Sequence, residues 1–181
     1  MSVLMASLEL NIFSWNATGI MSSAMYLCEV LNHKSVDFCG ISEHWLFEKN
    51  LHFLSELDRN YNSHGVCDSD LKLPSQRRVG KGGVAILWHK KHENNVYPLN
   101  IDDDRIVGIK YEINTTCSIY LIQVYLPCSN HSIENFRDYF DRLQNIIHYY
   151  SEKGLVILMG DMNTYLPWLS TRARPSGRSM C

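Results

Sequence analysis

Leu155-Val-Ile-Leu-Met-Gly-Asp-Met-Asn163 combines an apolar run with a polar end. Five consecutive apolar residues of this kind are typical of a central β-strand that is covered on both faces. Gly160 ends the run, and Asp161 and Asn163 follow it with side chains that can bind metal ions or form hydrogen bonds. A carboxylate placed directly after a buried strand is typical of a functional site at the rim of a sheet.

Three further segments show the same pattern of an apolar strand that ends in polar side chains. They are Phe13-Ser-Trp-Asn16, Ile41-Ser-Glu43 and Val124-Tyr125-Leu-Pro127. Each has an ordinary explanation when taken alone, as a turn residue, an exposed strand end or a half-buried ring. Because side chains from several strand ends can converge on one rim, the segments together predict a single site.

The rest of the chain alternates short β-rich runs with helical stretches, which predicts an α/β or α+β domain. Residues 114–116 are a connection of hairpin length, so part of the sheet is expected to be antiparallel. Arg105, after three aspartates, fits either a functional residue or a strand-start ion pair of little energetic weight. Helices are predicted over 22–32 and 133–151. Strands are predicted over Leu8–Trp15, Val36–Ile41, Gly83–His89, Arg105–Ile113, Cys117–Tyr125 and Leu155–Gly160.

The composition is that of an ordinary globular protein, with 45% hydrophobic and 20% charged residues. A net charge of −2 excludes a global positive field, so a polyanionic partner would need a local basic patch or bound metal ions. No apolar run approaches the ~20 residues that cross a bilayer, and no basic residue precedes Lys34, so we expect neither membrane insertion nor secretion. The six cysteines form no CxxC pair, which predicts buried free thiols in an intracellular, reducing compartment.

Two segments differ in character from the predicted strands and helices. Cys67–Lys81 has little apolar periodicity, and it fits either a functional loop or a solvated surface loop. After Thr164 the strand pattern stops. We therefore predict one domain over residues 1–164 and an irregular basic tail over residues 165–181.

The ordered motifs S-W-N (14–16), I-S-E (41–43), G-G-V-A-I-L (82–87), Y-x-P (125–127) and G-D-x-N (160–163) resemble the endonuclease/exonuclease/phosphatase family. This family includes DNase I, AP endonucleases, inositol polyphosphate phosphatases and retrotransposon endonucleases. The resemblance covers roughly Leu10–Thr164, and it implies a DNase I-like sandwich of two β-sheets flanked by helices. The segments at 41–46 and 102–109 are most similar to the endonuclease domain of non-LTR retrotransposons.

The resemblance implies a metal-dependent phosphodiester hydrolase, and it assigns a role to each strand-end residue. Glu43 would bind Mg²⁺, with Mn²⁺ as an alternative, and Asn16 would assist at the metal or bond a phosphate oxygen. Asp161 would orient and deprotonate the attacking water. Asn163 would hold the phosphate through its amide, and Tyr125 would donate a hydrogen bond to it.

The resemblance also implies a partner, the DNA phosphate backbone, and a nuclear location if the retrotransposon assignment holds. A reverse transcriptase domain in a longer chain is a further expected partner. A phosphoinositide-type phosphatase remains an alternative, because inositol phosphates are polyanions as well. The residues expected to contact the DNA backbone are Lys72, Arg77, Arg78 and Lys81.

The sequence departs from the family pattern at several positions. Thr18 stands where AP endonucleases often carry an aspartate, and no Ser-Asp-His motif is present, since all eight histidines precede Asp161. The aspartate expected between the last two family motifs is absent too. His44 is a poor substitute for the missing histidine, because adjacent strand residues point to opposite faces. We therefore expect a truncated or degenerate copy, incomplete at its C-terminal end and impaired in catalysis; the alternative is a silent remnant that binds metal or nucleic acid.

Overall fold

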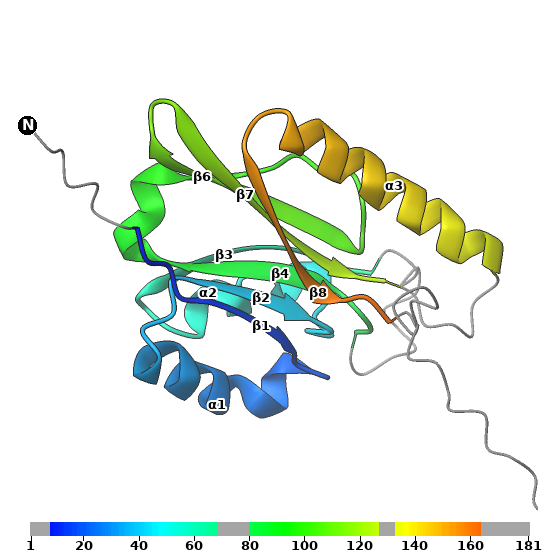
Figure 1. The fold of residues 1–181 in the computed structure, drawn as a ribbon. Coiled ribbons are helices and arrows are strands. Elements are labelled where there is room, and N and C mark those ends of the chain that lie inside the picture. Colours follow the sequence, from blue (N-terminus) through cyan, green and yellow to red (C-terminus); the bar gives the residue numbers. More distant parts are fainter. Residues whose placement is uncertain (1–7, 69–79, 127–132, 164–181) are drawn as a thin grey trace, which may run out of the picture.

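The computed structural model of the protein describes residues 8–68, 80–126 and 133–163, with side chains in the last segment from residue 137 onward. Two four-stranded β-sheets pack face to face, and helices cover their outer faces (Figure 1). This arrangement confirms the predicted α/β sandwich.

The first sheet has the strand order β1-β2-β4-β3, in which β1 and β2 are parallel and the other pairs antiparallel. Its strands are β1 (Ile12–Asn16), β2 (Phe38–Ser42), β3 (Tyr61–Val66) and β4 (Val84–His89). The second sheet has the order β5-β6-β7-β8, in which only β7 and β8 are parallel. Its strands are β5 (Val96–Pro98), β6 (Ile106–Asn114), β7 (Cys117–Tyr125) and β8 (Leu155–Asp161).

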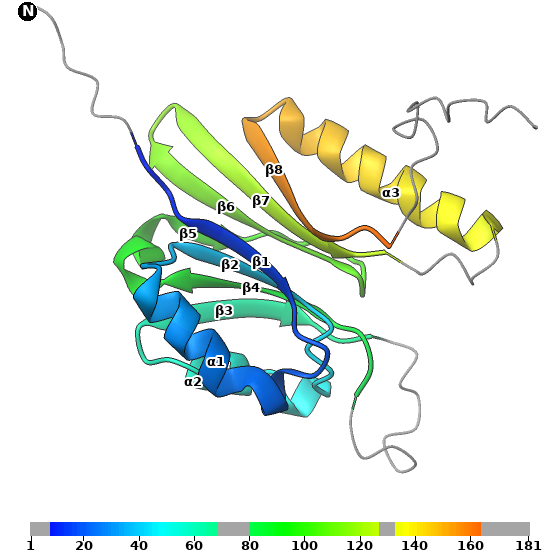
Figure 2. The same cartoon turned by 60° about the horizontal axis from the view of Figure 1, so that its bottom comes forward.

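The helices lie on opposite sides of the sandwich. Figure 2 shows α1 (Ile20–His33) and α2 (Phe53–Glu56) over the outer face of the first sheet. The longest helix, α3 (Ile133–Ser151), covers the outer face of the second sheet. Two short 3-10 helices, Glu48–Asn50 and Lys90–Asn95, complete the described elements. None of the helices in the described segments combines the length and apolar content that crossing a bilayer requires.

Three apolar layers follow from the two-residue period of the strands. On β2, Phe38 faces the second sheet, while Cys39 and Ile41 face the helix α1. On β6, Val107 and Ile109 face the first sheet, as their period-two spacing predicts, whereas Ile106 faces α3. The first sheet is therefore covered by α1 on one face and by the second sheet on the other. The part of the second sheet that packs on α3 is likewise covered on both faces.

The parallel pairs place four strand ends at one end of the sandwich. α1 connects β1 to β2 and α3 connects β7 to β8, so both strands of each pair run in the same direction (Figure 1). Asn16 is paired with Ser42 in the first sheet, and Tyr125 is paired with Asp161 in the second. The strand ends that the sequence predicts to carry the site therefore meet at one rim.

The structure corrects three sequence predictions. The apolar run at 155–160 predicts a central strand, but in the part of the chain that the structure describes β8 is an edge strand, and Leu155 and Leu158 on it are exposed. The prediction of a buried thiol is wrong for Cys117, which is exposed because it directly follows the hairpin turn. β3 and β5 have no predicted counterpart: β3 is mostly polar and is defined by its pairing with β4, and β5 has only three residues. The predicted tail at 165–181 lies outside the described residues and stays a prediction.

Candidate active site

The side-chain amide of Asn16 joins the carboxylates of Glu43 and Asp161. Its Nδ2 donates hydrogen bonds to Glu43 Oε1 at 2.8 Å and to Asp161 Oδ2 at 2.9 Å. Asn16 ends β1, Glu43 follows β2, and Asp161 ends β8, so the three side chains come from both sheets. The sequence pattern of polar strand ends thus corresponds to one cluster in space.

The orientation of the Asn16 amide is fixed by its partners. Its Oδ1 accepts hydrogen bonds from the backbone N–H and the hydroxyl of Thr18, at 3.1 and 3.2 Å. Ionised carboxylates only accept hydrogen bonds and a backbone N–H only donates, so the amide nitrogen must face Glu43 and Asp161. Thr18 therefore has a definite function in the cluster, which is to hold Asn16. The metal-ligand role expected of Asn16 stays a prediction.

Glu43 reaches the cluster because the backbone leaves the strand geometry at this residue. Along β2, Ser42 faces the second sheet, so an extended Glu43 would point the other way, toward α1. Glu43 instead has a φ of 56°, and its side chain bonds Asn16 on the inner side. Its second oxygen, Oε2, accepts a hydrogen bond from Trp45 Nε1 at 3.1 Å. Both oxygens of the Glu43 carboxylate are therefore held by the protein.

Asp161 is held in the same way at the end of β8. Its Oδ1 accepts the backbone N–H of Asn163 at 3.0 Å, and its Oδ2 accepts from Asn16. Asn163 also donates from Nδ2 to the carbonyl of Leu126 at 2.8 Å, which ties the end of β8 to the end of β7. Gly160 has a φ of +124°, and a Cβ there would collide with the backbone of Val124. Glycine is therefore required directly before the aspartate.

A buried polar chain beneath the cluster connects the two sheets. Gln123 on β7 donates to Ser42 Oγ at 2.8 Å, and Ser42 Oγ donates to the carbonyl of Val124 at 3.2 Å. Ser14 on β1 donates to the Gln123 carbonyl at 3.4 Å. The Gln123 side chain occupies the space that a Cβ at Gly40 would need. These bonds fix the spacing of the sheets next to the site.

Four residues of the site hold a backbone conformation that L-residues adopt at a cost. Thr18, Glu43, Trp45 and Asn163 have φ values of 44°, 56°, 56° and 42°. Among the non-glycine residues of the described segments, only Ser35 shares this region of φ. Such residues cost about 1–3 kcal/mol each and concentrate at functional sites. Their clustering around Asn16 supports a functional role for the rim.

Tyr125 lies beside Asp161 at the end of β7, and Arg105 lies against it. The Arg105 guanidinium is 5.6 Å from the centroid of the Tyr125 ring and 5.5 Å from that of Tyr139. Arg105 is buried and forms an ion pair with the buried Asp68 at 3.5 Å, so of the two alternatives for Arg105 the weak strand-start pair is the less favoured. Burial alone would lower the pKa of Arg105, but Asp68 and Tyr139 outweigh it and raise the pKa. Sequence reasoning missed this pair because Asp68 is distant along the chain.

His44 is a structural residue. Its Nδ1 accepts the backbone N–H of Leu46 at 3.0 Å, and its Nε2 lies 3.0 Å from the carbonyl of Val66, to which it donates. This pattern requires the neutral ring, and burial lowers the pKa of His44 to about 4. The ring also fills the space next to Gly83, whose φ is +82°. Both ring nitrogens of His44 are thus used on the backbone of Leu46 and Val66; because residues 43 and 44 follow β2, these bonds and not strand alternation set the position of the ring.

Of the four residues predicted to contact DNA, Lys72, Arg77 and Arg78 lie outside the described residues. Lys81 is exposed, and its neighbours Gly80 and Gly82 make backbone hydrogen bonds with Trp45 at 2.9 and 3.0 Å. Lys81 is thus attached to the segment that carries Glu43.

Within the described segments, no group of three or more His, Cys, Asp and Glu side chains could hold a metal ion. The donors at the rim are the two carboxylates of Glu43 and Asp161. Mg²⁺ commonly binds through one or two carboxylates and keeps several water ligands. The donor set therefore fits Mg²⁺ and does not fit a fully protein-ligated ion.

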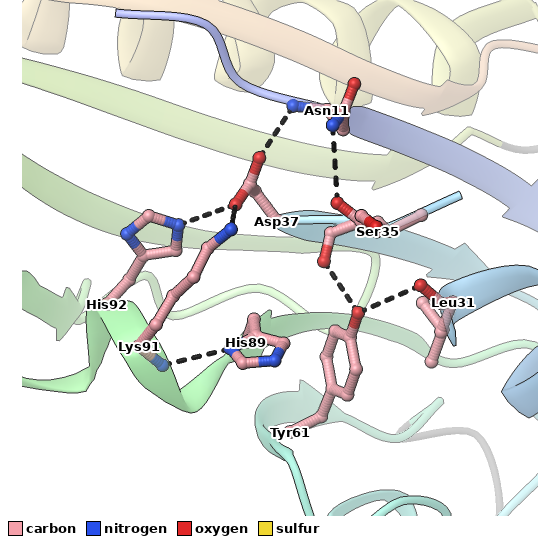
Figure 3. A network of polar contacts seen from close by, with 9 residues as sticks. Asn11, Leu31, Ser35, Asp37, Tyr61, His89, Lys91 and His92 are labelled. Atoms are coloured by element: carbon pink, nitrogen blue, oxygen red, sulfur yellow. Dashed lines mark hydrogen bonds and ion pairs between the residues drawn. The ribbon is translucent and has the colours of Figure 1, made fainter. Parts of the chain in front are cut away.

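A second polar cluster, centred on Asp37, lies at the opposite end of β2. Figure 3 shows Asp37 with the backbone N–H of Asn11 and the side chains of Lys91 and His92 around its carboxylate, at 2.8, 2.5 and 2.7 Å. Asp37 directly precedes β2, whereas Glu43 directly follows it. This cluster is therefore separate from the candidate active site.

Comparison with solved structures identifies the fold. The chain matches TDP2 of D. rerio complexed with single strand DNA product, with a TM-score of 0.60 and 22% identity over 86% of this chain and 61% of that one. It matches an AP endonuclease of Archaeoglobus fulgidus with a TM-score of 0.59 and 19% identity, over 86% and 58% of the two chains. The chain has the DNase I-like fold.

A third DNase I-like structure, the 3′ phosphatase NExo of Neisseria bound to product DNA hairpin, matches with a TM-score of 0.60 and 15% identity, over 86% of this chain and 58% of that one. Among curated proteins, Craniofacial development protein 2 of Bos taurus is 20% identical over 117 residues, which are 63% of this chain and 20% of that protein. No family model matches the sequence. The chain thus spans about three fifths of these DNase I-like structures and a fifth of the curated relative.

Proposed function

We propose that this chain carries the metal-binding half of a phosphodiester-hydrolysing site of the endonuclease/exonuclease/phosphatase family and that it acts on DNA. One observation carries the proposal: Asn16 Nδ2 bonds the carboxylates of both Glu43 and Asp161. Two acidic groups held together at a sheet rim provide the hard oxygen donors that Mg²⁺ or Mn²⁺ prefers.

Glu43 would hold Mg²⁺, with Asp161 close by. When bound there, the ion would neutralise charge on the non-bridging phosphate oxygens. Asn16 donates to one oxygen of each carboxylate, and Asp161 in its ionised form can orient a water molecule and accept its proton. The bond from the Asn163 backbone fixes the direction of that carboxylate.

Tyr125 and Asn163 would bind the phosphate from the second sheet. Tyr125 is paired with Asp161 across β7 and β8, so the two side chains leave the same face of the sheet. The nearby cation of Arg105 adds positive charge behind the tyrosine ring. These groups would stabilise the negative charge that increases on the phosphate during the reaction.

DNA is the proposed partner because of the basic residues of the 67–81 segment and because two DNase I-like neighbours are complexes with DNA. Lys72, Arg77, Arg78 and Lys81 would bind the phosphate backbone in a way that is independent of sequence and sensitive to salt. A phosphoinositide-type substrate is the alternative that shares the same metal and water chemistry.

A non-LTR retrotransposon origin is the finer proposal. It is supported by the I-S-E-H-W-L motif at 41–46 and by D-D-D-R-I-V-G-I at 102–109. If this proposal holds, a reverse transcriptase domain is the expected partner and the nucleus is the expected location.

A second candidate is a protein that binds metal and DNA without appreciable turnover. It is favoured by one feature of the sequence, the lack of any histidine after Asp161. A missing general acid or base commonly costs about 10²–10⁴-fold in rate. We propose that hydrolysis by these 181 residues is slow for this reason.

The test is nicking of supercoiled plasmid in Mg²⁺, with abasic duplex and soluble inositol phosphates as competing substrates. Slow nicking that is abolished in Glu43→Ala and Asp161→Ala, but kept in Glu152→Gln at an exposed position just after α3, supports the hydrolase. No nicking at any protein or Mg²⁺ concentration, with Mn²⁺ binding retained in calorimetry, supports the silent binder. Preferential cleavage of inositol phosphates would contradict the DNA assignment.

The role of the basic residues is tested separately by salt titration of duplex binding. Replacing Lys72, Arg77, Arg78 and Lys81 by alanine is expected to flatten the log–log salt dependence by about 0.9 for each phosphate that the variant no longer neutralises. An unchanged slope would show that these four residues do not contact the DNA backbone.

A further inference from the structure

We propose that Trp45 is a positioning residue of the site, whose indole N–H sets the direction in which the Glu43 carboxylate faces the metal. The inference rests on the proposed function. It starts from the hydrogen bond of 3.1 Å between Trp45 Nε1 and Glu43 Oε2. Because Asn16 holds the other oxygen at 2.8 Å, the two donors together fix the plane of the carboxylate.

Trp45 is itself held on several sides. Its backbone N–H donates to the carbonyl of Gly82 at 3.0 Å, and its carbonyl accepts from Gly80 at 2.9 Å. Its six-membered ring lies against Gly19, where a Cβ would come within 2.8 Å of Cε3. The indole N–H therefore has a defined position before any ligand binds, which is the requirement for a group that orients a metal ligand.

The backbone conformation of Trp45 supports a specific role. A φ of 56° is unfavourable for a bulky aromatic residue. It turns the ring back over Gly19, so that Nε1 reaches the carboxylate two positions earlier in the chain. Apolar packing alone does not need a left-handed residue, because a ring can be buried from ordinary strand or helix geometry. The strain is explained if the hydrogen bond to Glu43 is the feature that matters.

The same geometry connects the metal site to the basic segment. Gly80 and Gly82 flank Lys81, and both bond the Trp45 backbone. A change in the Trp45 position would therefore move Glu43 and the end of the 67–81 segment together. Trp45 is not a catalytic residue in this scheme, since its N–H is used on Glu43 and does not contact substrate.

The test measures metal binding without turnover. In calorimetry with Mn²⁺, Trp45→Phe keeps an aromatic side chain at this position and removes the indole N–H donor, and we expect about a 10-fold weaker affinity. Trp88→Phe is the matched control, because the buried Trp88 Nε1 has no hydrogen-bond partner within the described residues. Its Mn²⁺ affinity is expected to equal that of the wild type, with both variants checked by circular dichroism.

A second measurement needs no Trp45 variant. In ¹⁵N-labelled protein, the four tryptophans give four indole N–H signals, which Trp15→Phe, Trp88→Phe and Trp168→Phe assign by elimination. Mg²⁺ is expected to shift the Trp45 signal most, and Glu43→Gln is expected to abolish that shift. If the wild type binds no metal, the proposed function fails. If it binds metal while Trp45→Phe binds equally well, or the Trp45 signal does not move, only this inference is overturned.

Discussion

Asp37 shows how a single buried carboxylate is kept ionised at the end of the sandwich away from the candidate active site. Burial alone would raise the pKa of Asp37, but Lys91, His92 and the backbone N–H of Asn11 outweigh it and lower the pKa. The ring of His92, which Figure 3 shows beside Asp37, also stacks on Phe38 with ring centroids 5.2 Å apart, and this contact extends the cluster into the core between the sheets. Asp37 thus connects the segment before β1 to the turn after β4.

Asp37→Asn is expected to lower the free energy of unfolding by about 2 kcal/mol at pH 7, because charge-assisted hydrogen bonds are removed. The folded pKa of Asp37 lies below the unfolded value of about 3.9, so its contribution is complete above about pH 5 and declines as the pH falls toward the folded pKa. In urea titrations from pH 3 to 7, the free energy of unfolding should therefore fall less steeply toward low pH in the variant than in the wild type. Glu152→Gln, on an exposed pair, should match the wild type, and an unchanged pH dependence in Asp37→Asn would contradict the assignment.

At the scale of residues, the sequence predicted which side chains meet but not how they are held. Asn16, Glu43 and Asp161 could be named because each follows an apolar strand. The bond from Trp45 and the positive φ of Glu43 could not, because both depend on a local departure from strand geometry that no pattern of apolar residues encodes.

Among the elements, β8 has two roles within its seven residues, one in the core and one in the candidate site. Its middle packs Met159 against the first sheet, and its end must present Asp161 to Asn16. Gly160 makes both possible, since its φ of +124° brings the strand close to the backbone of Val124. The positive φ of Gly160 is therefore needed to position Asp161 in the candidate site.

Gly160→Ala is expected to destabilise the protein by about 1–3 kcal/mol, through a strained φ and a clash with Val124. Because the strain lies next to Asp161, Mn²⁺ affinity should fall as well. Thermal unfolding and calorimetry on the same samples measure both effects. Leu155→Ala, at the exposed start of β8, should change neither, and a stable Gly160→Ala with normal metal binding would show that the glycine is dispensable.

The elements themselves were predictable where periodicity is strong. β7 and α3 have the predicted bounds: β7 is a nearly continuous apolar run that is rich in β-branched and aromatic residues, and the apolar residues of α3 follow three- and four-residue steps. β3 was missed because a single residue of it, Tyr61, is fully buried, and its pairing with β4 is a tertiary effect. The position of β8 at the edge of its sheet could not be predicted either, because an apolar pattern indicates how buried a strand tends to be and not which strands lie next to it.

For the whole molecule, β1 and β8 are edge strands of the two sheets among the described residues, and they lie next to each other on the same side of the sandwich. Leu155 is 60% exposed and Leu158 36% exposed, although the sequence of β8 is that of an interior strand. Exposed apolar side chains on an edge strand favour association between chains.

We expect the protein to self-associate as its concentration rises, and Leu155→Lys/Leu158→Lys to reduce this association. Charged side chains on an edge strand disfavour strand pairing between molecules. Sedimentation velocity over a concentration series measures the effect. Met25→Lys, which removes an exposed apolar side chain from α1 instead, should leave association unchanged; if it is equally effective, general surface apolarity and not the β8 edge is responsible.

The Gln123 bridge has a consequence for how distant substitutions act. Because this side chain spans from β7 to Ser42 directly below the carboxylates, the separation of the sheets determines how far Glu43 stands from Asp161. A change of volume at a position such as Ile86, deep between the sheets, would alter that separation without touching either acid. The distance between the two carboxylates can thus be changed by substitutions in the core that lie far from the cluster.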